Sequence, residues 1–247
     1  MGKTMHLENL SWGTEVFDNL SGGVPAHLMS VVETPDHHSG NIVLGQFIYD
    51  GLKKGERCVL ITFESPLSFL ENFYHWDLNF KDYLSSEQFI FLNYQPNIAY
   101  EAGLTHDYDS ILTEVRQMCG GQMPQRLVIH QVDTLVNLNN PLLINVSAQK
   151  LAAAALSYGT DRPTILGQFV KFDDETHKNL AVAFQKTAHG YFAITQPDPL
   201  LPHKYSFQAK KIPWFNFVKQ PTAVNLVEGE GFKSDGSQRS PQRNQVA

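Results

Sequence analysis

Imidazole and carboxylate side chains occur in a few short segments of this sequence, where they could bind a metal ion. His37 and His38 follow Asp36, His130 ends an apolar run, and His189 precedes another. A site built from His37, His130 and His189, completed by a carboxylate, would suit a metal such as zinc. Adjacent histidines rarely hold one ion together, so the favoured interpretation is that these histidines bind no metal.

A serine hydrolase is a weaker candidate. Ser39 stands in His38-Ser39-Gly40, and the sequence has no G-x-S-x-G motif that would present a nucleophile on a strand-turn-helix elbow. Asp133 and Thr134 follow an apolar run, and we expect them to cap the next segment rather than to do chemistry.

Short apolar runs alternate with helical patterns along the chain and predict an α/β fold. The predicted strands are 26–32, 57–63, 89–94, 126–130, 163–170 and 190–195. The predicted helices are 41–54, 66–75, 107–119, 142–158 and 175–187. This rhythm is typical of a mostly parallel sheet flanked by helices. Beyond Pro197, the alternating segments 205–209 and 214–218 predict a C-terminal β hairpin.

The chain length favours one domain over residues 1–227, with the hairpin extension at about 198–227. Residues 228–247 are rich in Gly, Ser, Gln and Arg and predict a disordered tail.

Composition narrows the class of protein further. Hydrophobic residues make up 42% of the chain and the net charge is -6, so the overall charge gives no reason to bind nucleic acid or an anionic membrane. Cys58 and Cys119 lie far apart and predict neither a disulfide scaffold nor a cysteine-rich zinc site. No apolar stretch is long enough to span a membrane, so we expect a cytoplasmic protein without membrane insertion.

Three segments together resemble the RecA/KaiC-type ATPase family. Residues 13–25 are similar to the family signature G-x3-LD-x-L-x-GG-[IV]-P, with Phe17 in the leucine place. Residues 46–56 are similar to the helix end QF-x-Y-x-GL-x-x-GE, and Glu64-Ser65-Pro66 with Leu70 is similar to E-S-P-x-x-x-L. The resemblance implies a RecA-like fold.

The family's phosphate-binding loop has the pattern G-x-x-x-x-G-K-[ST], which this sequence does not match. Thr34 and Ser39 stand in the two glycine positions, Gly40 in the lysine position and Asn41 in the hydroxyl position. Counting back from Gln46, the loop positions are Thr34, Pro35, Asp36, His37, His38, Ser39, Gly40 and Asn41. The resemblance therefore implies a degenerate loop that is not expected to bind phosphate.

The other residues that this chemistry needs are also changed. Without the lysine no point charge offsets the outer phosphates, and Glu33 and Asp36 are expected to repel an anion. His130 replaces the aspartate that would orient Mg²⁺. Only Glu64 remains of the acidic pair that activates water, with Phe63 in the neighbouring place. ATP and Mg²⁺ are therefore not expected as cofactors.

The resemblance then implies a non-catalytic pseudo-ATPase that works as an adaptor, scaffold or regulatory subunit. Family members assemble side by side, and the accessory subunits of Elongator are RecA-like scaffolds that lack these motifs. We expect self-association or hetero-oligomers with other RecA-like subunits. The alternative is a residual nucleotide binder or slow ATPase that uses Glu64 and a non-standard loop.

A third hypothesis is a nucleic-acid-binding module in residues 204–219. This segment mixes basic and aromatic side chains, including Lys204, Lys210, Lys211 and Trp214, which could contact phosphates and stack on bases. The acidic net charge instead favours a hairpin that covers the sheet edge or meets another subunit.

Overall fold

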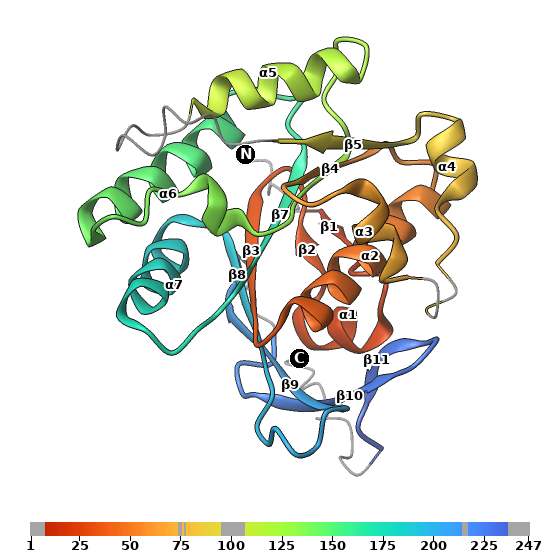
Figure 1. The fold of residues 1–247 in the computed structure, drawn as a ribbon, viewed down its shortest axis with the longest axis vertical. Helices are drawn as coiled ribbons and strands as arrows, with labels where there is room; N and C mark the ends of the chain where they lie inside the picture. The colour runs from red at the N-terminus through yellow and green to blue at the C-terminus, as the bar shows by residue number, and fades with distance from the viewer. Residues whose placement is uncertain (1–7, 74–75, 77, 95–106, 214–216, 237–247) are drawn as a thin grey trace, which may run out of the picture.

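A nine-stranded sheet runs through the protein in the order β11-β10-β9-β8-β3-β7-β6-β4-β5 (Figure 1). The computed structural model describes residues 8–73, 76, 78–94, 107–213 and 217–236. The predicted α/β class, with a mostly parallel sheet flanked by helices, is confirmed.

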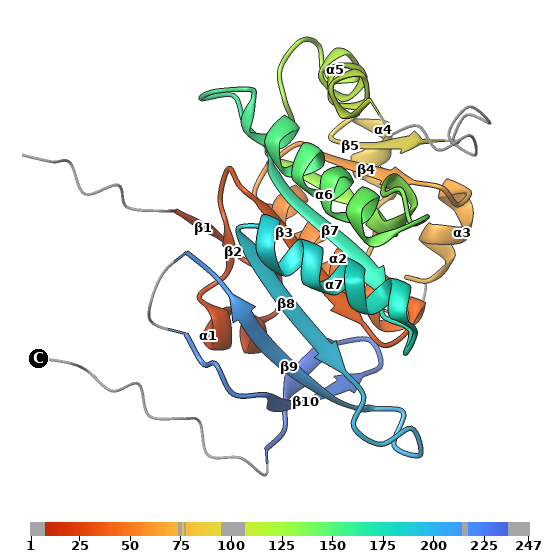
Figure 2. The same cartoon turned by 90° about the vertical axis from the view of Figure 1, so that its left-hand side faces the viewer.

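The strands from β8 to β5 in this order are parallel, and Figure 2 shows β3, β7 and β8 running side by side in one direction. They are β3 (Met29–Thr34), β4 (Cys58–Thr62), β5 (Phe89–Asn93), β6 (Arg126–Ile129), β7 (Thr164–Val170) and β8 (Gly190–Thr195). All but β5 are almost entirely buried, as their near-continuous apolar runs require of strands covered on both faces.

Helices cover both faces of the parallel part of the sheet (Figure 1). One face packs against α1 (Glu15–Ser21), α2 (His37–Lys53), α3 (Pro66–Glu71) and α4 (Lys81–Ser85). The other packs against α5 (Tyr108–Met118), α6 (Pro141–Leu156) and α7 (Glu175–Thr187). A short 3-10 helix, Val132–Leu135, follows β6. No described helix is both long and apolar enough to cross a membrane.

The C-terminal strands extend the sheet in antiparallel fashion, as predicted, but with different partners. β9 (Lys204–Lys211) pairs with β8 and with β10 (Thr222–Val227), and β10 pairs with β11 (Gly231–Ser234). The predicted hairpin strand 214–218 is therefore wrong at residues 217–218, which form no strand, while 214–216 lie outside the described residues. Disorder from residue 228 onward is also wrong for β11.

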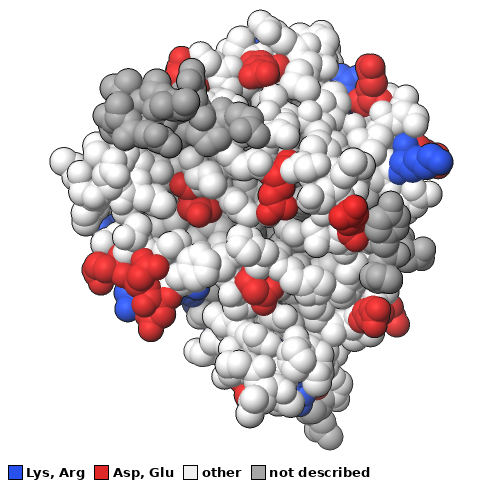
Figure 3. All heavy atoms as spheres, in the orientation of Figure 1, with Lys and Arg blue, Asp and Glu red and all other residues white. Residues whose placement is uncertain are grey.

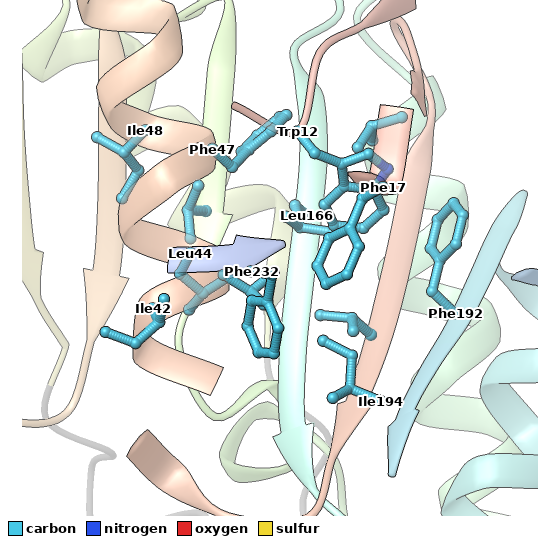
Figure 4. Close-up of a cluster of buried hydrophobic side chains, with 14 of the residues drawn as sticks. Trp12, Phe17, Ile42, Leu44, Phe47, Ile48, Leu166, Phe192, Ile194 and Phe232 are labelled. Atoms are coloured by element: carbon cyan, nitrogen blue, oxygen red, sulfur yellow. The ribbon is translucent and has the colours of Figure 1, made fainter. Parts of the chain in front are cut away.

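The last strand is ordered because it completes the core around the N-terminal segment. β1 (Asn9–Leu10) pairs with β2 (Val24–Pro25) in a two-stranded sheet, and α1 lies between them in sequence. Phe17 stacks on Phe207 and lies 5.0 Å, centroid to centroid, from Phe232. Trp12, Phe17 and Phe232 point into one apolar cluster (Figure 4). The segment beyond residue 228 thus contributes a buried aromatic ring.

Candidate functional site

The carboxyl ends of the parallel strands meet at one edge of the sheet, where ligands of open α/β folds bind. The turn between β3 and α2 lies at this edge. β3 continues through Thr34 and α2 begins at His37, so only Pro35 and Asp36 connect them. The Asp36 carboxylate accepts a hydrogen bond from the backbone N–H of Ser39 at 2.6 Å and caps the helix. Of the residues assigned to the degenerate loop, Thr34 therefore ends β3 and residues 37–41 form the first turns of α2, so the turn itself is short.

A side chain of β7 occupies the space next to Gly40, which stands in the family's lysine position. A Cβ atom on Gly40 would lie 2.6 Å from Nε2 of Gln168, a fully buried residue of β7. Gln168 Nε2 donates to Thr34 Oγ1 at 2.8 Å, and Thr34 Oγ1 donates to the carbonyl of Asp36 at 3.0 Å. A lysine at position 40 would have to displace Gln168, which sequence reasoning did not single out.

Two buried polar atoms near the start of α2 and the end of β6 have no hydrogen-bond partner among the described residues. They are Oδ1 of Asn41, in the hydroxyl position, and Nε2 of His130, in the aspartate position. The other nitrogen of His130 lies 3.3 Å from Thr62 Oγ1. Burial, and then the charge of nearby His37, lower the pKa of His130 to about 4. The imidazole is therefore neutral at neutral pH and does not fit the role of an anionic Mg²⁺ partner.

The structure connects His37 to Glu64 through a residue that sequence reasoning missed. Gln131 Nε2 lies 3.2 Å from His37 Nδ1 and donates to Glu64 Oε1 at 3.2 Å. Gln131 has φ 55°, in the left-handed region, two residues after the end of β6. Its place just beyond the end of a buried parallel strand was the available signal.

Asp133 also belongs to this edge. Burial raises the pKa of its carboxyl group, while His177 and His37 lower it by smaller amounts, so both imidazoles lie within electrostatic range. Asp133 Oδ1 has no hydrogen-bond partner among the described residues. His177 lies in the first turn of α7 with Nδ1 2.7 Å from the Asp174 carboxylate. Asp133 lies inside the 3-10 helix, and Gln131 rather than Asp133 or Thr134 is its N-terminal cap residue.

The three histidines considered for a metal site do not meet. His189 precedes β8, and its N–H donates to the carbonyl of Met29, the first residue of β3. His37 follows the other end of β3. His189 therefore lies at the amino edge, and the expectation that it approaches His37 and His130 is wrong. In the part of the chain that the structure describes, no group of three or more His, Cys, Asp or Glu side chains could hold a metal ion.

Glu33 does not face the β3–α2 turn, contrary to the expectation that it repels an anion there. Its carboxylate is almost fully buried and accepts hydrogen bonds from Tyr191 Oη and from Lys210 Nζ, the latter at 2.6 Å. Lys171 Nζ lies 3.5 Å away. This cluster joins β3, β8 and β9 on the face that carries α7, so of the two carboxylates expected to repel an anion, Asp36 lies at the turn and Glu33 does not.

The basic residues of the nucleic-acid hypothesis do not form one exposed patch. Lys210 pairs with buried Glu33, and Lys211 Nζ donates to the carbonyl of Lys186 at 3.0 Å. Lys204 is exposed at the start of β9, and Trp214 lies outside the described residues. Two of the candidate side chains are therefore engaged within the fold.

The parallel sheet, its flanking helices and the strand-turn-helix at residues 34–41 are those of the RecA-like P-loop class. A sequence model of the KaiC ATPase family matches residues 10–159, more than half of the chain. The chain belongs to this KaiC-like family. No curated protein matches it significantly.

Proposed function

We propose that this chain is a KaiC-like domain that does not hydrolyse ATP and acts by binding other proteins, as an adaptor, scaffold or regulatory subunit. The observation that carries the proposal is the hydrogen bond from Ser39 N–H to the Asp36 carboxylate. A helix N-terminus is a ready-made phosphate site because its N–H groups are free. Here a carboxylate of the chain itself occupies that position.

The surroundings of the turn support the same conclusion. Gly40 brings no cation, and Gln168 fills the space next to it. Lys171 and Lys210 are paired with Glu33 on the other face of the sheet. A nucleoside triphosphate would therefore meet the charge of Asp36, while Lys171 and Lys210 are already paired with Glu33, and this repulsion costs free energy at close range.

The residues in the positions that would orient Mg²⁺ are also unsuited to that role. His130 is a neutral imidazole in the position where an anionic oxygen would orient Mg²⁺ through water. The Glu64 carboxylate is engaged by the Gln131 amide. The residues present do not fit a magnesium nucleotide.

Calorimetric titration of the purified chain with ATP and with ADP, both with Mg²⁺, tests the proposal. We expect no binding at micromolar nucleotide and no phosphate release above background. Turnover that is lost in Glu64→Ala, and kept in the matched surface variant Glu114→Ala on α5, would contradict it and favour a slow ATPase. Light scattering on the same sample reports whether the chain self-associates, and co-purification tests hetero-oligomers with other RecA-like subunits.

A further inference from the structure

Basic side chains lie together where the central parallel strands begin. In the sheet order β9-β8-β3-β7, the adjacent strand ends carry Lys211 at the end of β9, His189 before β8, His27 before β3 and Arg162 before β7. β9 is antiparallel to β8, with Lys211 opposite Tyr191, so its last residue lies at the edge where the other three strands start. Neighbouring strands are about 4.8 Å apart, so the four residues span about 14 Å of this amino edge.

Two contacts hold His27 next to Arg162. His27 has φ 59°, in the left-handed region, and its backbone N–H donates to Thr164 Oγ1 at 2.9 Å. Its ring Nδ1 lies 2.8 Å from the carbonyl oxygen of Arg162. A carbonyl only accepts, so Nδ1 carries the proton of this contact and Nε2 points to the other side of the ring. The exposed imidazole therefore borders the loop that carries Arg162.

The polar groups of Arg162 and His189 are not satisfied by the described part of the chain. The guanidinium of Arg162 forms no hydrogen bond or ion pair with a described residue, and its Nε is buried. Nδ1 of His189 is also buried without a partner among these residues. Buried donors in folded proteins nearly always have an acceptor. Both side chains can therefore donate to an acceptor that comes from outside the chain.

The charges of this edge lie close together. Burial lowers the pKa of His189, and the charges of Lys211 and Arg162 lower it further, so both cations are within electrostatic range of the imidazole. Burial also lowers the pKa of Lys211. One N–H of Lys211 Nζ donates to the carbonyl of Lys186 at 3.0 Å, which leaves the other two for a further partner. Neither cation is paired with a carboxylate of the residues that the structure describes.

The carboxylate next in sequence is engaged elsewhere. Asp161 precedes Arg162, but its Oδ2 accepts from the N–H of Met123 at 3.3 Å and lies 3.9 Å from Nε of Arg116. On the opposite side of the sheet the visible charges are mainly acidic. Figure 3 views the molecule from the side toward which β7 and β8 run, and red acidic groups stand there at several places with few blue groups. The start of these strands is therefore the end that attracts an anion.

From this arrangement we infer that the amino ends of β3, β7 and β8 form a binding site for a phosphate-type oxyanion, either inorganic phosphate or the phosphate group of a small ester. Arg162 is the anchor, because a planar guanidinium binds two oxygens of one oxyanion side by side. His189 and Lys211 supply further donors from neighbouring strands. A phosphate offers more oxygens and more charge than a carboxylate, so it matches donors that come from several directions.

The site is independent of the proposed function. It lies at the opposite end of β3 from the β3–α2 turn. The like charges of Arg162 and Lys211 repel each other and disfavour the protonated form of His189. A bound anion offsets this repulsion, so it stabilises the folded chain and raises the pKa of His189.

Three variants separate the site from general charge effects. Arg162→Met removes the anchor, and Arg162→Lys keeps the charge without the planar fork. Lys81→Met is the matched control, because it removes one exposed positive charge from α4, which packs on β5 at the other end of the sheet. Arg162 makes no hydrogen bond to a described residue, so we expect its replacement to leave the fold intact.

Thermal unfolding in sodium phosphate, and in sodium chloride of equal ionic strength, measures binding. With phosphate at about ten times its dissociation constant, the melting temperature of the parent and of Lys81→Met should rise by about 3–5 °C more than that of Arg162→Met. Arg162→Lys should lie between them. The general stabilisation by phosphate is common to all four proteins. In chloride, Arg162→Met should be at least as stable as the parent, because it loses the repulsion.

An NMR pH titration gives a second measurement at His189. We expect phosphate to raise the pKa of this imidazole in the parent chain and to leave it unchanged in Arg162→Met. Equal thermal shifts in all four proteins, or a pKa of His189 that phosphate does not change in the parent, would overturn the inference.

Glycerol phosphate in the same assays distinguishes the two sources of the anion. A shift equal to that of phosphate assigns the site to phosphate esters, and a shift with phosphate alone assigns it to the free ion; both support the inference. ATP also carries phosphates, so weak ATP binding that is lost in Arg162→Met belongs to this edge and leaves the proposed function standing. ATP binding that persists in Arg162→Met counts against the proposed function and not against this site.

Discussion

The buried polar groups at the two ends of α2 differ in how completely they are hydrogen-bonded. At the C-terminal end, the fully buried guanidinium of Arg126 forms ion pairs with Asp50 and Glu56 and donates to the carbonyls of Phe47 and Ser11. At the N-terminal end, Asn41 Oδ1 and His130 Nε2 have no partner among the described residues.

The difference separates a structural site from a candidate functional one. Buried polar groups in native proteins are nearly always hydrogen-bonded, and each exception is costly. The Arg126 cluster ties α2 to β6 and to the N-terminal segment, so its complete pairing fits a purely structural role. Asn41 and His130 lie at the end where the KaiC-like family does its chemistry, so part of the free-energy cost of incomplete pairing falls on this edge.

The largest effect is expected at the paired end. Arg126→Met leaves Glu56 without its cation and leaves Asp50 with only the exposed Lys54; the two carboxylate side chains are 20% and 15% exposed. We expect the free energy of unfolding in urea to fall by about 3–5 kcal/mol. Arg116→Met, at a side chain that is 49% exposed, is the control and should cost less than about 1 kcal/mol. Similar losses of unfolding free energy in the two variants would show that the buried Arg126 cluster stabilises the fold no more than an exposed arginine does.

A pH effect of comparable size is expected at the unpaired end. The pKa of His130 is about 4 when folded, below the ordinary value of 6.5, so protons favour the unfolded chain as pH falls from about 6.5 to 4. The shift corresponds to a loss of about 3 kcal/mol across that window, with the full contribution present above pH 6.5. His130→Leu should flatten this part of the stability profile, and His203→Leu, at an exposed site, should not. An unchanged slope in His130→Leu would show that His130 titrates normally.

Gly40→Lys restores the family lysine and tests the crowded turn. Because its Cβ atom would lie 2.6 Å from Gln168 Nε2, we expect a loss of about 1–3 kcal/mol of stability and no gain of ATP binding. Adding Gln168→Ala should recover part of the loss. A stable Gly40→Lys variant that binds ATP would contradict this expectation and show that the β3–α2 turn can accommodate the lysine.

Asp36→Ala should have the smallest effect, about 1 kcal/mol, through the lost N-terminal cap of α2. The matched change is Asn140→Ala, because Asn140 Oδ1 caps α6 through the N–H of Leu143 at 3.0 Å. Thermal or urea unfolding compares the two. A gain of stability in Asp36→Ala alone would indicate that the carboxylate is strained rather than favourable.

The regular part of the fold was predictable from the sequence because local patterns determine it. The predicted bounds of α7 and β8 agree with the structure, since strong periodicity and flanking turn residues mark both. β11 was missed because its four residues, Gly-Phe-Lys-Ser, have a polar and flexible composition, and their order depends on distant Phe17. Such long-range packing leaves no local signal.

The site was less predictable for the same reason. The family pattern imposed a loop at 34–41, although an aspartate three residues before Ser39 is itself a helix-start signal. The candidate metal site grouped His189 with His37 and His130, although a residue directly before a parallel strand must lie at its amino end. Gln168 could not be found from spacing, because its contact with Gly40 depends on β3 and β7 being neighbours.

The contact of the first helix with the last strand has a consequence for the order of folding during synthesis. Thr14 Oγ1 donates to the carbonyl of Phe232, across 218 positions of the chain, and Phe17 packs on the ring of Phe232. As the ribosome releases the chain, the side of α1 that packs on Phe232 stays exposed until the more than 200 residues between them have emerged. A chaperone that shields aromatic surface would therefore have a long period of engagement with α1.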